Sequence, residues 1–159
     1  LPCGTGRLSE LIAGHADRMI LADASETMLE VAREDLPDLQ ADYRVLDLEA
    51  IALPDAGVDL IFCHRFLHHI HDHAQRRRIF NELARVSGRY VILSYYTSGF
   101  RTRWRWWGKR LIGRVAPDTR PATFAQFQAE AADAGLRPVH QAVLRTYPLG
   151  LFCLFEKTR

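Results

Sequence analysis

Two hydrophobic periods alternate along the chain, one typical of buried strands and one typical of amphipathic helices. Apolar runs of four to six residues, bounded by turn residues, predict strands. These runs lie at 18–22, 43–46, 58–63 and 90–94. Apolar residues at every third or fourth position predict helices in the stretches around them. The expected helices are 7–16, 25–34, 74–86 and 123–134.

Capping residues support two of these helices. Ser25 and Thr123 precede helical stretches, and their hydroxyl groups can accept a backbone N–H of the first turn. In the helix that begins after Ser25, we expect Met28, Leu29 and Ala32 on the buried face.

The order of the elements predicts an α/β fold. Strands that alternate with helices form mostly parallel sheets with helices on both faces, which gives a three-layer sandwich. Two last strands are expected at 138–145 and 151–156, and their short connection favours an antiparallel pair at the end of the sheet. We therefore expect 1–159 to be a single domain, with an irregular insert at about 97–121.

Composition narrows the class of protein. The 159 residues are 48% hydrophobic and 25% charged, which is typical of a globular domain with a buried core. No apolar run approaches the roughly 18 residues of a membrane-spanning helix. Cys3, Cys63 and Cys153 lie far apart, which argues against a disulfide framework and a cysteine-rich zinc site. We expect a reducing, cytoplasmic compartment.

A glycine-rich loop, Cys3-Gly4-Thr5-Gly6, directly precedes the first predicted helix. Glycines at such a junction let the backbone approach a ligand closely, and a helix N-terminus favours electron-rich groups. A tight turn without a ligand is the alternative. Asp23 ends the next strand, where a carboxylate can accept hydrogen bonds from both hydroxyls of a ribose.

Asp47 closes the following strand. Its carboxylate can accept from an adenine amine while the backbone N–H of Leu48 meets a ring nitrogen, although a strand-end cap explains Asp47 equally well. The glycine loop, Asp23 and Asp47 recur at the carboxyl ends of consecutive strands, where open α/β sheets bind ligands. Together they predict an adenosine-containing cofactor.

Four stretches of the sequence resemble the class I S-adenosylmethionine-dependent methyltransferases, within their broad small-molecule group that includes ubiquinone-pathway enzymes. They are LPCGTGRLSELIA, ILADASETMLEVAR, VLDLEAIALPDAGVDLIFC and the His-His pair after it. The resemblance is close over 1–94 and extends to the end by architecture, and it implies a Rossmann-like fold. In that family an acidic residue and a strand precede the glycine loop. We therefore expect the first strand to be missing from this chain, which is then N-terminally truncated, and Pro2 replaces the usual first glycine.

The resemblance implies S-adenosylmethionine as cofactor, with in-line methyl transfer to a small-molecule or lipid-like acceptor. Gly4 and Gly6 would line the methionine part and Asp23 the ribose. The other implied contacts are Asp47 and Leu48 at the adenine, His64 beside the sulfonium, and Cys3, Thr5, Ala24, Met28 and Cys63 along the rest of the cofactor.

Two other functions stay open. A non-catalytic module that binds an adenosine cofactor or a partner is the first alternative. An NAD-binding oxidoreductase is the second, but its loop would carry a third glycine where this chain has Ser9.

Five histidines lie within ten residues, at 64, 68, 69, 71 and 73. A metal site needs three or four converging ligands, and the resemblance accounts for His68 and His69 without a metal, so we expect none. His68 or His69 is a candidate general base, because an imidazole pKa near 6.5 suits deprotonation of a hydroxyl at neutral pH. A packed or solvated loop is the alternative.

Residues 100–114 combine three tryptophans with six basic residues and no acidic one. A peripheral membrane contact, a cap over the acceptor and a purely structural helix all suit this segment. Tyr95, Trp104 and Trp107 are expected on the substrate side. The remaining 15 basic residues are outnumbered by 19 acidic ones, which disfavours nucleic acid as a partner. The sequence carries no signal for an oligomeric state.

Overall fold

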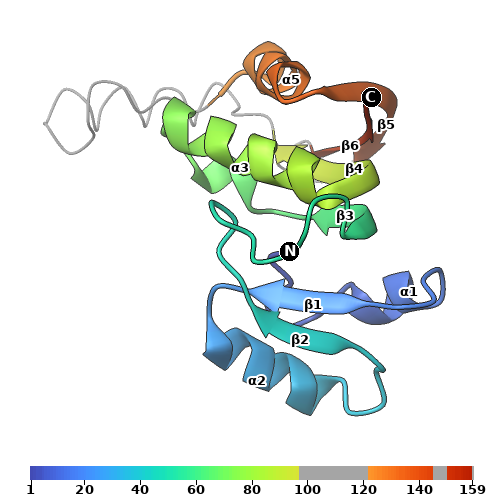
Figure 1. Cartoon of the computed structure of the whole chain (residues 1–159). Coiled ribbons are helices and arrows are strands. Elements are labelled where there is room, and N and C mark those ends of the chain that lie inside the picture. Colours follow the sequence, from blue (N-terminus) through green and yellow to red (C-terminus); the bar gives the residue numbers. More distant parts are fainter. Residues whose placement is uncertain (97–121, 145–149, 159) are drawn as a thin grey trace, which may run out of the picture. The chain divides into compact units, whose positions relative to one another are not determined.

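A computed structural model describes residues 1–96, 122–144 and 150–158 of the chain. The chain divides into two compact units, Leu1–Leu53 and Pro54–Arg159. Figure 1 labels the helices and strands of both units. Among the described residues, no helix has the length and apolar character needed to cross a membrane.

The first unit holds two helices and two strands. They are α1 (Ser9–Ala13), β1 (Ile20–Asp23), α2 (Glu26–Asp35) and β2 (Asp42–Val45). The two strands pair in parallel, with Ile20 opposite Asp42. Leu29 and Ala32 of α2 are buried, because their spacing places them on one side of the helix.

Two expectations for this unit need correction. Helix α1 is shorter than 7–16, because Gly14 ends it by donating its backbone N–H to Ile12 O. Met28 is 42% exposed rather than buried, since it lies in the first turn of α2, beside the N-cap and away from the core contacts of Leu29. The Ser25 cap is confirmed, because its hydroxyl accepts the N–H of Met28.

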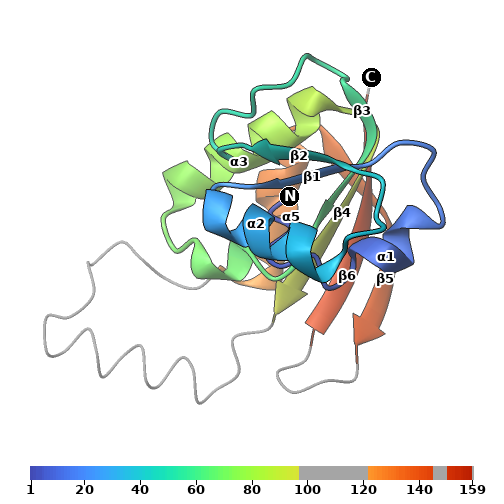
Figure 2. The same ribbon diagram turned by 90° about the horizontal axis from the view of Figure 1, so that it is seen from below.

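The second unit carries four strands and three helical segments. They are β3 (Val58–Cys63), η1 (Leu67–His69), α3 (His73–Val86), β4 (Ser87–Tyr96), α5 (Phe124–Asp133), β5 (Leu136–Leu144) and β6 (Gly150–Lys157). The strand order is β3-β4-β6-β5, and Figure 2 shows β6 between β4 and β5. The pair β3–β4 is parallel, whereas β6 runs antiparallel to both neighbours, as the sequence predicted.

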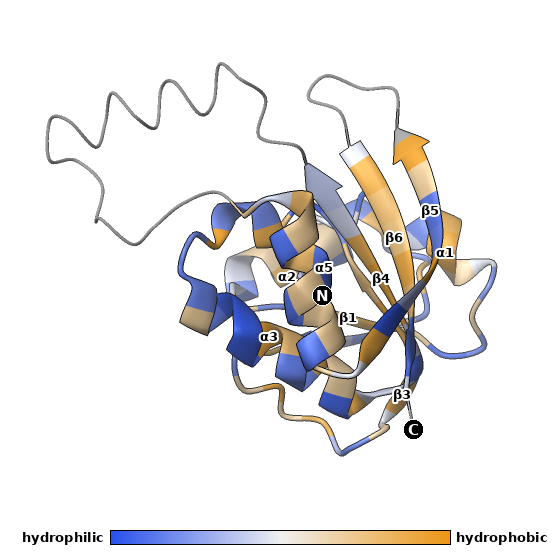
Figure 3. Cartoon of the chain, turned by 90° about the horizontal axis from the view of Figure 1, so that it is seen from above, coloured by the Kyte–Doolittle hydropathy of each residue, from blue (hydrophilic) through white to orange (hydrophobic). Residues whose placement is uncertain are grey.

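The core of the second unit lies between the sheet and its helices. Phe80 of α3 and Phe127 of α5 pack edge to face at 5.2 Å, and Phe155 of β6 lies 6.2 Å from Phe127. All three are almost fully buried. The hydrophilic stretches of α3 are blue in Figure 3, as expected for a helix that buries only one side.

The described strands form two sheets rather than one continuous sheet. At the outer edge of β1, the backbone of Cys3 donates to Ala22 O at 2.8 Å, so the glycine loop occupies this edge. Strand β3 lies where 58–63 was predicted but is not buried throughout, because Leu60 is 41% exposed. The parallel pairs and the antiparallel C-terminal part confirm the mixed α/β fold class.

Candidate functional site

The glycine loop is a tight turn that rests on the end of β1. Gly4 and Gly6 have φ angles of 54° and 76°, a left-handed conformation that other residues adopt only with strain. Gly6 donates its N–H to Cys3 O at 3.0 Å, and Ser9 donates to Gly6 O at 2.8 Å. These bonds carry the chain directly from the loop into α1.

The two glycines have different surroundings. A Cβ at Gly6 would lie 2.6 Å from Cδ1 of Leu36, so the Leu36 side chain would have to move. A Cβ at Gly4 would meet nothing within 4 Å. Gly6 is therefore needed for packing at the end of α2, whereas Gly4 leaves an open approach to the backbone.

Asp23 fastens the glycine loop to the start of α2. Its Oδ2 accepts the N–H of Gly4 at 2.9 Å, and its Oδ1 accepts the N–H of Ser25 at 3.0 Å. The residue is half-buried. Each carboxylate oxygen has a second lone pair, so Asp23 can still accept from two hydroxyl groups.

Asp47 and Leu48 lie at the same end of the β1–β2 pair, because Leu46 donates its N–H to Asp23 O at 3.0 Å. Asp47 is exposed, and its Oδ1 accepts the N–H of Glu49 at 2.9 Å. The side chain of Leu48 is buried, and its N–H meets no acceptor in the described part of the chain. This end thus offers a carboxylate acceptor beside a backbone donor.

The remaining predicted contacts of the first unit surround this end. Ala24 and Met28 are exposed, while Thr5 and Cys3 are half-buried. Burial raises the pKa of the Cys3 thiol, and its Sγ–H donates to Gly4 O at 3.4 Å. The thiol is therefore neutral at physiological pH.

Cys63 ends β3 in the second unit and is fully buried. Burial raises the pKa of its thiol to about 11, so it is neither a nucleophile nor a metal ligand at neutral pH. His64 follows it, half-buried, and stacks on Phe152 of β6 at 5.0 Å and on Phe62 at 6.1 Å.

The ring of Tyr96 lies near the rings of both His64 and His68. Its ring centroid lies 6.3 Å from that of His64 and 5.1 Å from that of His68. His68 in turn lies 3.9 Å from His69. Tyr96 lies on the opposite face of β4 from Tyr95, because successive side chains alternate along a strand.

His64, His68 and His71 are neutral at physiological pH. Burial, reinforced by neighbouring cationic groups, lowers the pKa of His64 and His71, and lowers that of His68 to about 4. The Nδ1 atoms of the three rings are enclosed without a hydrogen-bond partner. Protonation of any of these rings would place an N–H without an acceptor at the enclosed Nδ1, which disfavours the charged form. His68 is thus a much weaker base than an ordinary imidazole of pKa near 6.5.

Arg65 lies between His64 and His68 in the sequence and has an unusual backbone conformation. Its φ of 55° is uncommon for any residue other than glycine. Its N–H donates to Ser94 Oγ at 2.6 Å, and its guanidinium carbon lies 5.9 Å from the centroid of Tyr96. The strained backbone therefore sets a cation beside the histidine rings, which the sequence pattern did not indicate.

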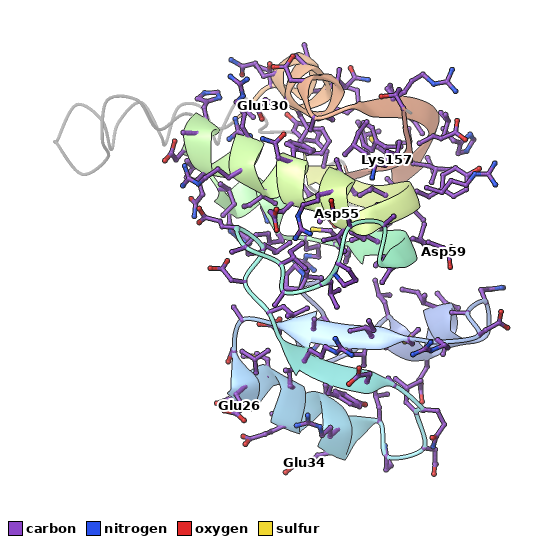
Figure 4. All side chains as sticks on the ribbon, in the orientation of Figure 1. Glu26, Glu34, Asp55, Asp59, Glu130 and Lys157 are labelled. Atoms are coloured by element: carbon purple, nitrogen blue, oxygen red, sulfur yellow. The ribbon has the colours of Figure 1, made fainter. Side chains whose placement is uncertain are left out.

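His73 lies apart from this group. Its Nδ1 is 2.9 Å from Glu130 Oε1 and 2.7 Å from an amino group of Arg76. Arg76 and Glu130 form a buried ion pair between α3 and α5, with Glu130 labelled in Figure 4. Across 1–96, 122–144 and 150–158, no three His, Cys, Asp or Glu side chains are arranged to hold a metal ion.

The expected substrate side is only partly described. Tyr95 is buried, its ring packs 5.2 Å from Phe124 and Phe127, and its hydroxyl donates to Ala122 O at 2.8 Å. Trp104, Trp107 and the whole insert at 97–121 lie outside the described residues. The membrane-contact and cap interpretations of this segment stay predictions.

Residues 1–92 match the model of the methyltransferase domain family. The match covers more than half of the chain and includes the glycine loop, Asp23, Asp47 and the histidine segment. The chain therefore belongs to the methyltransferase domain family, which confirms the family expected from the sequence. Membership also supports the methyltransferase and S-adenosylmethionine predictions that depend on it.

Two curated proteins are similar to this chain. The ubiquinone/menaquinone biosynthesis C-methyltransferase UbiE of Pseudoalteromonas translucida is 30% identical over 95 residues, which cover 57% of this chain and 38% of that protein. The trans-aconitate 2-methyltransferase of Variovorax paradoxus is 38% identical over 87 residues, covering 53% and 33%. The matched region thus spans 38% of one relative and 33% of the other, about a third of each.

Solved structures share the fold. A SAM-dependent methyltransferase from Methanosarcina mazei superposes with a TM-score of 0.81 at 19% identity, covering 98% of this chain and 89% of that one. Magnesium protoporphyrin IX methyltransferase from Synechocystis PCC 6803, solved with bound SAH, gives 0.78 at 18% identity, covering 99% and 72%. At these identities the likeness shows the fold alone.

Proposed function

We propose that this chain is an S-adenosylmethionine-dependent methyltransferase that methylates a small-molecule acceptor. The observation that carries the proposal is the carboxylate of Asp23, which fixes the Gly4 and Ser25 N–H groups and keeps lone pairs for a ribose. The two units would act as one methyltransferase domain, because the single family match extends across both of them.

The residues of the first unit fit the cofactor. Gly4 offers open space for the methionine part, Asp23 offers acceptors for the two ribose hydroxyls, and the Leu48 N–H offers a donor for an adenine ring nitrogen. Asp47 would accept from the adenine amine. When bound, S-adenosylmethionine supplies an electrophilic methyl group on a positively charged sulfur.

The protein contributes orientation rather than acid–base chemistry. Alignment of the attacking atom with the methyl group and the leaving sulfur supplies several kcal/mol of barrier lowering. Asp23 fixes the orientation by clamping both the loop and the helix start. The partly apolar surroundings of His64 suit a reaction in which a positive charge disappears, and His68, with its pKa near 4, is suited to donate or accept a hydrogen bond.

The alternatives make different predictions for binding. Ser9 stands where a dinucleotide-binding loop has its third glycine, and its side chain is buried beneath the turn, so the close helix approach of that motif is not available. A non-catalytic module would bind S-adenosylmethionine without transferring its methyl group.

The proposal includes three more specific parts. The acceptor would be lipid-like, residues 100–114 would make a peripheral membrane contact, and the protein would be cytoplasmic.

Calorimetric titration of the chain with S-adenosylmethionine and, separately, with NADH tests the proposal. We expect binding of the methyl donor with a Kd on the order of micromolar and no heat with NADH. Binding of NADH alone would overturn the proposal. If the donor binds but labelled methyl never reaches any of a panel of hydroxyl, amine and carboxylate acceptors, the non-catalytic module is the better description.

A further inference from the structure

A second group of side chains, in the unit Pro54–Arg159, has a chemistry of its own. Its members are Phe62, His64, Arg65, His68, Tyr96 and Phe152, called here the His-aromatic cluster. Successive ring centroids lie 5.0–6.3 Å apart, from Phe62 through Phe152, His64 and Tyr96 to His68. Five of the six are half-buried and Arg65 is exposed, so a ligand can reach them.

Arg65 is the permanent cation of the His-aromatic cluster, and it has no carboxylate partner in the described part of the chain. Within the same residues, no carboxylate forms an ion pair with His64 or His68. Other arginines of the same unit do have acidic partners, as Arg76 has Glu130 and Arg85 has Asp55. The basic groups here are therefore available to an anion from outside.

Arg65 is fixed in place rather than mobile at its backbone. A non-glycine residue at a φ of 55° persists only where its surroundings hold it, and here Ser94 Oγ holds its N–H at 2.6 Å. Such strain occurs preferentially at functional sites. The result is a guanidinium over the face of Tyr96 and close in sequence to the two histidines.

His64 and His68 can donate a hydrogen bond to an anion as neutral rings. Their Nδ1 atoms are enclosed, so only Nε2 can meet a ligand. The pKa of His68 is lowered to about 4, chiefly by burial and in smaller part by the positive charges of its neighbours, Arg65 among them. At neutral pH the Arg65 guanidinium supplies a positive potential beside His68, which an anion would offset.

We propose that the methyl acceptor is an aromatic carboxylic acid whose carboxylate binds beside Arg65 and His68 while its ring lies against Tyr96. That this ligand accepts a methyl group rests on the proposed function. The anion site itself is inferred from the geometry of the His-aromatic cluster alone. Arg65 would form the charge-assisted hydrogen bonds, and His68 Nε2–H would add a further donor. A carboxylate oxygen would take the methyl group, so that an O–CH3 bond forms as the S–CH3 bond breaks and the products are a methyl ester and S-adenosylhomocysteine. No proton has to be removed in this step, which suits a site where His64 and His68 are weak bases.

Benzoate and its neutral analogue benzamide test the site by NMR of the histidine rings. A carboxylate close to His68 should raise the pKa of His68 from about 4 toward its ordinary 6.5, saturably with benzoate concentration. Benzamide should leave it unchanged. His140, on the exposed strand β5, is the matched control ring and should not respond to either compound.

Three results would overturn the inference. Benzamide could shift His68 as benzoate does, His140 could move together with His68, or inorganic sulfate at equal concentration could match benzoate, which would leave an adventitious ion only. Calorimetry with S-adenosylmethionine on the same sample separates the two proposals. If S-adenosylmethionine binds but benzoate does not shift the pKa of His68, only this inference is refuted. If benzoate shifts the pKa of His68 but S-adenosylmethionine does not bind, only the proposed function is refuted.

Substitution at Arg65 gives a second measurement. Arg65→Gln keeps the Cβ and the backbone strain but removes the charge, so benzoate affinity should fall roughly ten-fold or more. Arg65→Lys should recover part of the loss. The control Arg137→Gln removes an exposed arginine of β5 that pairs with Glu156 and should leave benzoate affinity unchanged. Equal affinity in Arg65→Gln and the parent chain, with the melting temperature preserved, would refute the site.

Discussion

The carboxylate of Asp23 accepts the backbone N–H of Gly4 at 2.9 Å, across a sequence separation of 19 residues. The same carboxylate holds the N–H of Ser25, so one side chain joins the glycine loop, the end of β1 and the start of α2. A residue expected only to bind ribose thus also sets the shape of the loop that would receive the methionine part.

Replacement of Asp23 should therefore weaken cofactor binding in two ways. Asp23→Ala removes the acceptor for the ribose and also releases Gly4, so we expect binding of S-adenosylmethionine to weaken by about 1.5–3 kcal/mol, measured by calorimetry. Asp38→Ala, at an exposed turn position, is the matched control and should bind like the parent chain. An unchanged dissociation constant for Asp23→Ala would remove Asp23 from the site.

The two loop glycines should respond differently to alanine. Gly4→Ala and Gly6→Ala each impose left-handed strain of about 1–2 kcal/mol, and Gly6→Ala must in addition displace Leu36. Urea unfolding should thus show the larger loss of stability for Gly6→Ala. Cofactor affinity should fall more in Gly4→Ala, because its added methyl group occupies the open approach.

Gly14→Ala is the control for these two variants. Gly14 has a φ of −63° and open space around a Cβ, so the change should be close to neutral. Equal cofactor affinity in Gly4→Ala and Gly14→Ala would contradict a role of the Gly4 backbone in cofactor binding.

The buried pair Arg76–Glu130 should be costly to break. Arg76 is 1% exposed, donates to both oxygens of Glu130 and also to Ile70 O. Arg76→Met leaves Glu130 without its main partner, and we expect a loss of about 3–5 kcal/mol in urea unfolding. Arg137→Met, which breaks an exposed pair, should cost no more than about 1 kcal/mol. Similar costs for the two variants would contradict the assigned role.

Acid should destabilise the protein in a window set by His68. Burial lowers its pKa to about 4 in the folded chain from an ordinary 6.5, so unfolding takes up a proton between these pH values. Stability consequently falls as the pH falls from 6.5 to 4, and His68 has no effect above this window. Urea unfolding at pH 7.5 and pH 4.5 should show a smaller acid loss in His68→Gln than in the parent chain.

His140→Gln provides the comparison for that experiment and should retain the full acid loss. Glu130 contributes to the pH dependence of stability at lower pH values than His68 does. Burial by itself would raise its pKa, but hydrogen bonds and charges from Arg76 and His73 outweigh this and lower it. Its contribution is present above its ordinary pKa and is lost only as the pH falls below that. An acid loss in His68→Gln equal to that of His140→Gln would rule out the assignment to His68.

Local patterns in the sequence predict what local chemistry determines. The N-caps Ser25 and Thr123 appear as expected, because each depends on residues within one helical turn. Gln126 completes a capping box with Thr123, which was not predicted. Asp23 and Asp47 could be located because Asp23 ends β1 and Asp47 follows two residues after the end of β2. The donors Ser25 and Glu49 lie two residues beyond Asp23 and Asp47, whereas the donor Gly4 is 19 residues from Asp23 and is not revealed by the local pattern.

Other features depend on distant parts of the chain, which periodicity does not reveal. Arg76 and Glu130 are separated by 54 residues, and each taken alone reads as a solvated helix position. Arg65 gives no sign in the sequence that its backbone is left-handed. Tyr96 becomes part of a site only because β4 places it beside His64 and His68.

The most direct test of the central claim is the amide NMR spectrum of the chain titrated with S-adenosylmethionine. Contact with the glycine loop and the ends of β1 and β2 should shift the amide signals of Gly4, Ser25 and Leu48 in parallel, with one dissociation constant. Unchanged signals for all three residues, with saturable shifts elsewhere in the chain, would contradict the proposed cofactor site.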